Sequence, residues 1–502
     1  MYKNTQVLKE LTSSIPNHQS LWEKMISELI SKGSSFEPQK LRNSKPNGGI
    51  KKILESWANY KGKSDGFINE HLSFDKEIEV KNDLKTESNI LDFSQSLWAN
   101  LKRAPDNSKW VGSRIPLPNS YLVPSEGDTE SSYWESYFIL LGLVISGNKQ
   151  LAIDMVNNYA YLLEKHGLIP SKCRYYSMSS SQPPYFSMMV SLIVNKGWAE
   201  WQDYALAFRR EYQFWMEGAD VEAADGFAYR RVVKVKGYVL NRYWNDQSTK
   251  NEEVIDKYSD LIQSAVKKGV SEEEILEHLS SAKESGWEFS SRWMSDSTDL
   301  TSLKTAHIIP IELNALLSHL EFALGKAFPA EKNQWSARVR ERRSALNTLF
   351  WNGETYTDID LDGIGRNDHL SSAMFYPLWI GAPGIKQIDR ILEILELNYL
   401  SKGGVLTSLI NSGQNWDFPN IYPPVQWACI AGSYRAGNEK LAKKIAQCYT
   451  SNCDAYFKKY KSFPKKYDSD FDNSEQMKTS SGWSLGVYLA CKHFIETGEI
   501  IS

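Results

Sequence analysis

Cysteine and histidine are scarce in this sequence, and long apolar runs are missing. Of the 502 residues, 5 are cysteine and 8 are histidine. An odd number of cysteines at unrelated spacings favours reduced thiols over a disulfide framework or a zinc site. No segment is apolar for long enough to cross a membrane, and Met1 to Ser14 lacks the apolar stretch of a signal peptide. These absences predict a cytoplasmic protein that does not span a membrane.

The sequence also lacks an excess of either charge. A net charge of -3 gives no electrostatic reason to expect a nucleic acid or an anionic membrane as partner. There is no glycine-rich phosphate loop, and the calcium-loop pattern that begins at Asp358 has His369 where a bidentate glutamate is needed. We therefore expect a small-molecule substrate, no cofactor and no metal. Nothing in the sequence indicates a particular oligomeric state.

Aromatic residues, by contrast, are abundant. The chain has 17 tryptophans and 26 tyrosines. Flat rings with one polar edge suit the walls of a pocket for a sugar or another organic ligand, and the alternative is that they pack the core. The composition therefore favours an organic ligand without identifying it.

Helical periodicity dominates the chain. Apolar residues recur at three- and four-residue spacings in several segments between residues 151 and 395, which predicts amphipathic helices that pack on each other. Loops rich in tryptophan, glycine and proline separate these segments, and little strand alternation is visible. The charged segment Asn251–Glu284 mixes both signs and predicts a solvated helical insertion. We expect an all-α protein whose binding residues lie on loops at one rim of the scaffold.

Short motifs rich in tryptophan, proline and acidic residues follow one another along the chain. The first, at residues 123–137, keeps Pro124, Glu130, Trp134 and Tyr137, and another, at residues 412–427, contains Gln-Asn-Trp-Asp-Phe-Pro. Between and after them lie Ser181–Pro184, Leu240–Trp244, Glu284–Trp293 and Gly482–Trp483. In this order the motifs resemble the signature segments of the trehalase family of glycoside hydrolases, over roughly Phe36 to Cys491.

The resemblance implies an (α/α)6 barrel and an inverting glycosidase mechanism. In that mechanism a carboxylic acid protonates the glycosidic oxygen, while a carboxylate on the opposite face of the sugar activates water. Glu288 stands where the family has its acid, an aspartate. Ser474 aligns with the family's base, so Glu475, one residue later, is the candidate for that role. We expect a helical arm at residues 1–47 and the barrel domain at residues 48–502.

Other residues of these motifs are expected to bind the substrate. They are Asp128, Trp134, Glu135, Gln182, Asn241, Trp287, Arg292, Gln414, Trp416 and Asp417. The alternative is that the two acids near the first motif face solvent and that the tryptophans pack the barrel.

Three positions depart from the family in a way that bears on the substrate. Family arginines that hold sugar hydroxyls align with Gly127, Ser180 and Asn251. Hydrogen bonds from a charged donor contribute roughly 1.5 to 3 kcal/mol each, so the loss of three donors would weaken trehalose binding by several powers of ten. The pocket is then expected to be more acidic and to favour a cationic substrate or intermediate.

These observations favour an enzyme on a trehalase-like scaffold that uses Glu288 as general acid on a substrate other than trehalose. Such a substrate is another glycoside, or an alkene or terpenoid that is isomerised or cyclised through a cationic intermediate. Two alternatives stay open. One is inverting hydrolysis of α,α-trehalose, and the other is non-catalytic binding of a sugar or metabolite.

Overall fold

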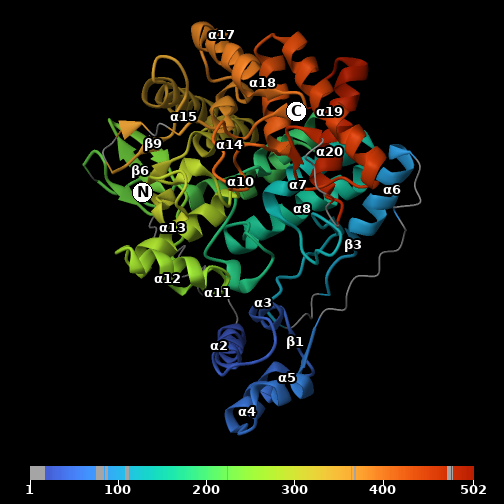
Figure 1. Cartoon of the computed structure of the whole chain (residues 1–502), viewed down its shortest axis with the longest axis vertical. Coiled ribbons are helices and arrows are strands. Elements are labelled where there is room, and N and C mark those ends of the chain that lie inside the picture. Colours follow the sequence, from blue (N-terminus) through green and yellow to red (C-terminus); the bar gives the residue numbers. More distant parts are fainter. Residues whose placement is uncertain are drawn as a thin grey trace.

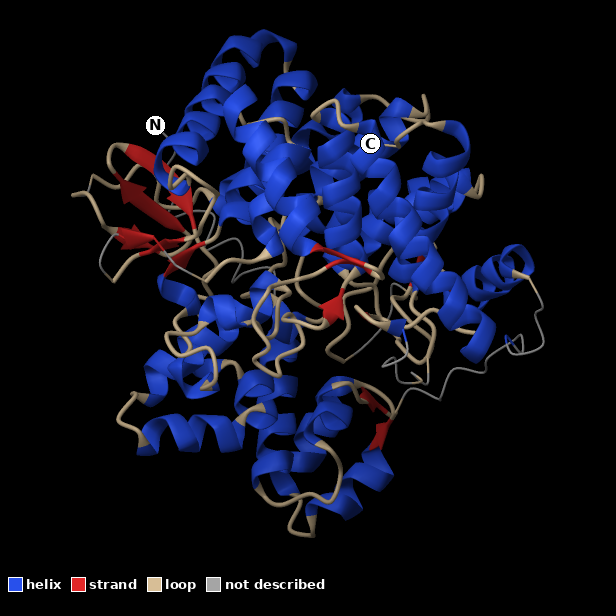
Figure 2. Cartoon of the chain, turned by 45° about the horizontal axis from the view of Figure 1, so that its top comes forward, coloured by secondary structure: helices blue, strands red, loops and turns tan. Residues whose placement is uncertain are grey.

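The computed structural model describes residues 17–74, 84, 89–107, 112–222, 224–362, 365–366, 369–471, 476 and 479–501. Within these residues helices predominate and every strand is short (Figure 2). The predicted all-α class is confirmed.

An inner ring of helices forms the centre of the main body. Each helix contacts the next, and the last contacts the first. In order around the ring they are α7 (Tyr133–Ile145), α9 (Phe186–Asn195), α14 (Ile311–Ala327), α16 (Tyr376–Trp379), α18 (Pro423–Arg435) and α20 (Gly482–Thr497). Most residues of these helices are buried, as expected where a helix has neighbours on all sides.

An outer layer of helices packs around the ring. Its members are α6 (Ile90–Leu101), α8 (Lys149–His166), α10 (Ala205–Trp215), α15 (Lys332–Ala345), α17 (Ile385–Ile394) and α19 (Glu439–Tyr460). α6 packs on α20, α8 on α7 and α9, α10 and α15 on α14, and α19 on α18 and α20. Inner and outer helices alternate along the chain, and this is the (α/α)6 barrel that the family resemblance implies (Figure 1).

Two glycines allow α7 and α20 to approach closely. A Cβ on Gly486 would lie 2.1 Å from the backbone oxygen of Phe138, and a Cβ on Gly142 would lie 2.7 Å from the Cα of Gly486. Any larger residue would force the helices apart. The loops that precede the two helices are joined as well, because the Gly482 backbone N–H donates to the Pro124 oxygen at 2.7 Å. These contacts bring both loops to the same end of the barrel.

The strands join loops in small antiparallel sheets. The pairs are β1 (Lys45–Pro46) with β2 (Leu72–Ser73), β3 (Lys102–Arg103) with β4 (Tyr121–Leu122), β11 (Leu400–Ser401) with β12 (Gly404–Val405), and β13 (Asn420–Ile421) with β14 (Tyr467–Asp468). The three-stranded sheets are β5 (Ala228–Tyr229), β6 (Val232–Val235) and β7 (Tyr238–Asn241), and β8 (Ile308–Ile309), β9 (Ile359–Asp360) and β10 (Gly365–Arg366). None of them forms a layer of the core.

The N-terminal helices form a smaller unit beside the barrel (Figure 1). They are α2 (Asn17–Ser31), α3 (Pro38–Arg42), α4 (Ile50–Asn59) and α5 (Ser64–His71). Buried residues from Trp22 to Leu72 make a hydrophobic cluster of their own. The cluster extends past Asn47, and the division of the chain at that residue stays a prediction.

The charged segment Asn251–Glu284 is helical, as expected. It forms α11 (Glu252–Lys257), α12 (Ser259–Lys267) and α13 (Glu272–Ser285). The segment is less exposed to solvent than its mixed charges predict, because Glu284 is fully buried. The Glu284 carboxylate accepts hydrogen bonds from the Ser181 and Trp244 backbone N–H groups. The insertion is therefore tied into the barrel rather than lying loosely over it.

One buried carboxyl makes the stability of the barrel depend on pH. Glu211 of α10 accepts a hydrogen bond from the Tyr133 hydroxyl, and burial raises the pKa of Glu211 to about 8. Between its unfolded pKa and pH 8, the folded protein holds a proton that the unfolded chain releases. Stability should therefore fall as pH rises through this range, by at most about 1.4 kcal/mol per pH unit.

The variant Glu211→Gln should lack this part of the pH dependence. Thermal unfolding of both proteins at pH 5, 6.5 and 8 would measure it as a melting temperature that falls less steeply for the variant. All other titrating groups are common to the two proteins, so equal slopes would show that Glu211 does not bind its proton more tightly when folded.

Candidate active site

A cavity of about 860 Å³ opens at the end of the barrel where the loops before α7, α9, α18 and α20 meet. We call this space the barrel cavity. Its wall consists of residues from 124–135, 171–182, 253–258, 283–289, 415–422, 465–466 and 481–483, together with Gln39 and Asn43 of the N-terminal unit. Sites for small organic molecules have volumes of roughly 300 to 1,000 Å³. The cavity is large enough for an organic substrate.

Glu288 lies in this wall, on the loop that follows α13. The helix is capped by Gly286, whose positive φ of 76° and close approach to Trp134 exclude a side chain. The Glu288 carboxylate accepts a hydrogen bond from the Tyr258 hydroxyl at 2.6 Å and another from the Lys257 ammonium at 3.2 Å. Two donors at the end of α11 therefore set the orientation of the carboxyl that was predicted to be the acid.

Lysines balance the carboxylates of the barrel cavity. The described wall contains the acids Asp128, Glu130, Glu135, Glu253 and Glu288, and the bases Lys172, Lys257, Lys283, Lys465 and Lys466. No arginine lines this described wall, as the three lost family arginines predict. The prediction of an acidic pocket is corrected, because five ammonium groups offset the five carboxylates.

Lys465 lies among the carboxylates that the sequence singled out. Its ammonium donates to Glu135 at 3.1 Å. The charge of Glu135 raises the pKa of Lys465, burial opposes this effect, and Asp128 and Glu288 add to the increase. Lys465 therefore brings a hydrogen-bond donor close to three predicted site residues.

A second ionic cluster forms the wall next to α11. Glu253 pairs with both Lys172 and Lys283. Burial alone would raise the pKa of the Glu253 carboxyl, but the two ammonium groups outweigh it and lower the pKa to about 2. The carboxylate stays charged at neutral pH and fixes two lysines of the wall.

The rings of the aromatic wall are stacked on one another. Trp416 lies between Trp287, at a centroid distance of 4.7 Å, and Tyr422, at 3.8 Å, with both pairs nearly parallel. Trp134 contacts Trp416 at 5.7 Å. Trp134 and Trp416 line the cavity as predicted, whereas Trp287 supports Trp416 and is not part of the wall.

Three further predicted residues also lie in the cavity wall. Asp128 accepts from the backbone N–H and the hydroxyl of Ser125, which closes a turn of the first motif. Gln182 accepts from the Trp134 backbone N–H at 3.3 Å. Glu135 is the partner of Lys465 described above. The structure therefore brings Asp128, Trp134, Glu135, Gln182, Glu288 and Trp416 together around one space.

Four other predicted binding residues do not line the cavity. Asn241, Arg292 and Asp417 are fully buried, and Gln414 lies two residues before Trp416 with its side chain outside the wall. Asn241 bonds to the Trp215 backbone and to Arg342, and Asp417 accepts from Ser290 and Ser291. Asn241 and Asp417 therefore stabilise the loops through buried hydrogen bonds and do not face the cavity.

Arg292 belongs to a buried ionic cluster. Its guanidinium donates to Asp358 at 2.8 Å and to Glu312 at 2.7 Å. Asp358, the first residue of the calcium-like pattern, therefore points into the core and not into a loop. Among the described residues, no group of three or more His, Cys, Asp or Glu side chains is arranged to hold a metal.

The second predicted catalytic residue, Glu475, lies outside the described residues, as does Ser474. Sequence reasoning missed Lys257, Tyr258, Glu253 and Lys465. Lys465 directly precedes the family-like Lys466-Tyr467 pair, but nothing in its local spacing indicates that it meets Glu135, which is 330 positions away.

Comparison with known proteins agrees with this architecture. The family model described as Trehalase matches residues 31–495. The chain is 34% identical over 408 residues to a protein named putative periplasmic trehalase from Salmonella typhi, covering 78% of this chain and 71% of the relative. It is 33% identical over 431 residues to a periplasmic trehalase from Xanthomonas oryzae pv. oryzae, covering 83% and 75%.

A solved structure supports the fold. Neutral trehalase Nth1 from Saccharomyces cerevisiae superimposes with a TM-score of 0.62 at 20% identity, covering 76% of this chain and 74% of that chain. At this identity the likeness shows the fold alone.

The expected cytoplasmic location is wrong. The curated relatives cited above carry names that place them in the periplasm. In the described part of the chain, no helix has both the length and the apolar character needed to cross a membrane. The scarcity of cysteine, on which the expectation rested in part, did not indicate the compartment.

Proposed function

Because this chain belongs to the trehalase family, we propose that it is a glycoside hydrolase that cleaves α,α-trehalose with Glu288 as general acid. The observation that carries the proposal is the position of Glu288, at the family's acid position, in a cavity walled by tryptophans and lysines. We also propose the periplasm as its compartment, on the names of its relatives. Fractionation of cells that express the native gene tests that second proposal.

The chemistry follows from the carboxyl that the cavity presents. Protonated Glu288 would give its proton to the glycosidic oxygen as the bond to the anomeric carbon breaks, and a water activated by a carboxylate would attack from the other face. Glu475 remains the predicted base. Two glucose molecules result, one of them with inverted configuration.

The lysines supply the hydrogen-bond donors for sugar hydroxyls that the missing arginines would otherwise supply. An ammonium donates up to three hydrogen bonds and accepts none, so it suits sugar hydroxyl oxygens as a donor. Lys465 and Lys257 both lie within hydrogen-bond distance of cavity carboxylates. Because such carboxylates also accept from hydroxyls, each lysine and its partner can share one sugar hydroxyl between them. This arrangement supports trehalose binding without guanidinium groups.

The direct test is incubation of the purified full chain with trehalose at neutral pH. We expect release of two glucose molecules per trehalose. Before the anomers equilibrate, proton NMR should show one β-glucose for each α-glucose. Maltose, an α-glucoside with a different linkage, is the control and should react far more slowly. Absence of glucose from trehalose would contradict the proposal.

A second candidate is acid chemistry on a substrate other than trehalose. The absence of arginine from the described cavity wall favours it, because trehalases of this family hold the sugar with guanidinium groups at the positions of Gly127, Ser180 and Asn251. Other glycosides and alkenes that react through a cation are the test panel. Consumption of one of them, but not of trehalose, would establish this candidate. A compound that raises the melting temperature without being consumed would instead indicate a binding protein.

A further inference from the structure

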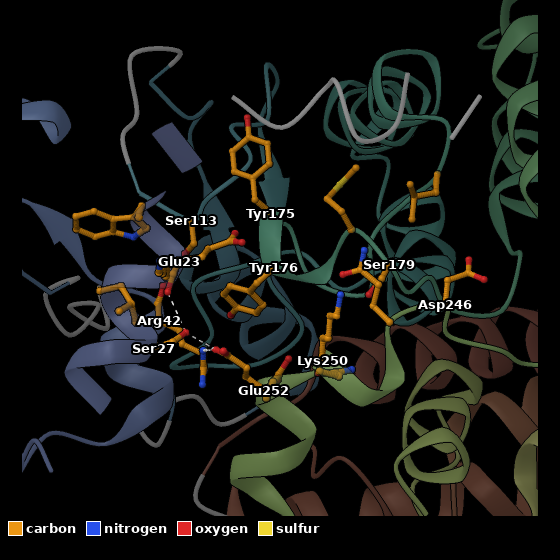
Figure 3. Close-up of a pocket in the computed structure, with 18 of the residues that line it drawn as sticks. Glu23, Ser27, Arg42, Ser113, Tyr175, Tyr176, Ser179, Asp246, Lys250 and Glu252 are labelled. Carbon is orange, nitrogen blue, oxygen red and sulfur yellow. Dashed lines mark hydrogen bonds and ion pairs between the residues drawn. The ribbon is translucent and has the colours of Figure 1, made fainter. Parts of the chain in front are cut away.

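The N-terminal unit reaches the active site through one short helix. Arg42, the last residue of α3, forms ion pairs with Glu252 and Asp256, both on α11. The Ser27 hydroxyl of α2 donates to Glu252 at 2.6 Å. In Figure 3, Ser27 and Arg42 face Glu252 across the boundary between the two parts of the chain. The N-terminal unit therefore holds α11 through two ion pairs and one hydrogen bond.

The other end of α11 holds the candidate acid. Lys257, its last residue, and Tyr258, which follows it, are the two donors to the Glu288 carboxylate. Asp256, which pairs with Arg42, is the residue next to Lys257. The path from Arg42 to the Glu288 carboxyl thus passes through two sets of polar contacts and a few residues of one helix.

α11 depends on such contacts for its position. It has six residues, and isolated helices shorter than about 12 residues are marginal in water. Besides the contacts with the N-terminal unit, α11 is held by Glu253, which pairs with Lys172 and Lys283 of the barrel. Its other supports are the Asn251 side chain, which accepts from the Val254 backbone N–H, and buried Val254. The contact with the N-terminal unit borders a cavity of about 420 Å³ lined by Trp22, Tyr176 and Lys250 among others, so specific ion pairs and not continuous packing hold α11 there (Figure 3).

Helix α3 of the N-terminal unit also contributes residues to the wall of the barrel cavity. Gln39 and Asn43, four residues apart on and just after α3, line its wall and both bond to the Tyr176 hydroxyl at 2.9 Å. Arg42 is also anchored, because the Ser113 hydroxyl donates to its backbone oxygen at 2.7 Å. α3 is thus fixed to the barrel loops on one side and to α11 on another.

We propose that Arg42 is a positioning residue for catalysis: by anchoring α11 it places Lys257 and Tyr258 so that they orient Glu288. The inference rests on the proposed function, since it takes Glu288 as the acid. It adds that the N-terminal unit is part of the active site. Arg42 touches neither substrate nor reacting atoms, and its effect passes through α11.

The experiment compares two ways of breaking the same contact in the full-length protein. Arg42→Ala removes the cation, and the pair Glu252→Gln with Asp256→Asn removes its partners from exposed or half-buried positions where folding is not at risk. We expect each to lower kcat for trehalose about 10-fold, because displacement of a catalytic group by a fraction of an ångström is costly. KM should change by less than about twofold, since no substrate contact is lost.

Two controls separate positioning from general stability. Arg230 also pairs with two carboxylates, Glu217 and Asp246, but contacts no residue of α11 in the described structure, so Arg230→Ala should keep the wild-type kcat. Arg42→Lys keeps a charge and should restore part of the rate. Combining Arg42→Ala with the Glu252 and Asp256 changes should cost no more than either alone, because all three remove one interaction.

Hydrogen exchange gives a readout that does not need turnover. In Arg42→Ala the peptide that covers residues 252–258 should exchange faster, while peptides of α14 and α18 should not change. Wild-type kcat together with unchanged exchange in the Arg42 variant overturns the inference even if trehalose is cleaved. If the wild-type protein does not cleave trehalose, the proposed function fails, and exchange alone decides: unchanged protection at 252–258 overturns the positioning role, and faster exchange supports it.

Discussion

Replacement of Glu288 by glutamine is expected to slow glucose release from trehalose by about 10²- to 10⁴-fold, the usual contribution of general acid catalysis. The amide keeps the size of the side chain and can still accept a hydrogen bond from the Tyr258 hydroxyl, which donates to the Glu288 carboxylate at 2.6 Å in the native protein. It has no acidic proton to give to the departing glycosidic oxygen. Because substrate contacts are preserved, kcat should fall much more than KM rises.

The comparison needs a carboxyl that is close in the chain but outside the cavity. Glu274 of α13 is half exposed and does not line the cavity, so Glu274→Gln should retain the wild-type rate. Glu288→Asp restores the family's aspartate but shortens the reach to Tyr258 and Lys257, and we expect a rate between those of the wild type and the glutamine variant. Stopped-time glucose assays across pH 5 to 8 measure all three. Full turnover by Glu288→Gln would remove Glu288 from the mechanism.

The helices of the barrel could be predicted from sequence because their signal is local. Between residues 151 and 395, the apolar residues at helical spacing from Leu151 onward lie on α8, and those from Leu313 onward lie on α14. The closing of these helices into a barrel came from the family resemblance, since periodicity says which face is buried and not which helix covers it. The close crossing of α7 and α20 at Gly142 and Gly486 likewise could not be predicted from the apolar spacing of either helix.

The motif residues divide into those that face the cavity and those that hold its loops. Trp416 and Asp417 are neighbours in one motif, yet Trp416 lines the cavity while Asp417 is turned inward to four serines. Successive residues of an irregular loop point in different directions, and a motif does not record which. A buried carboxylate needs hydrogen-bond partners, so a structural role can explain a motif residue as well as a ligand contact can.

The net charge of the cavity wall could not be predicted, because the residues that form its ion pairs are far apart in the sequence. Lys465 meets Glu135 from the far end of the sequence, and Lys172 meets Glu253 across 81 positions. Reasoning from the motif at residues 123–137 counted the acids near the lost arginines but had no means of adding lysines from other loops. Local composition therefore overstated the acidity of the site.

Replacement of Arg292 by methionine is expected to destabilise the fold by about 3 to 5 kcal/mol, the usual cost of breaking a buried ion pair from one side. The guanidinium is fully buried, bonds to Asp358 and Glu312, and lies 4.1 Å from the Trp293 ring centroid. Its removal would leave two carboxylates without their cation. Urea unfolding at pH 7 should show a large loss in the midpoint, whereas Arg338→Met, at an exposed ion pair, should show almost none.

The pH dependence of the Arg292→Met variant distinguishes this role from substrate binding. Burial already raises the pKa of Glu312, and the charge of Arg292 opposes that increase. Without Arg292, the folded pKa of Glu312 should rise further, so the folded variant holds a proton that the unfolded chain releases as pH increases. The loss of stability should therefore be smaller at pH 5 than at pH 8. A variant with wild-type stability but a raised KM for trehalose would instead place Arg292 in contact with the sugar, which requires the loop at 286–293 to turn outward when substrate binds.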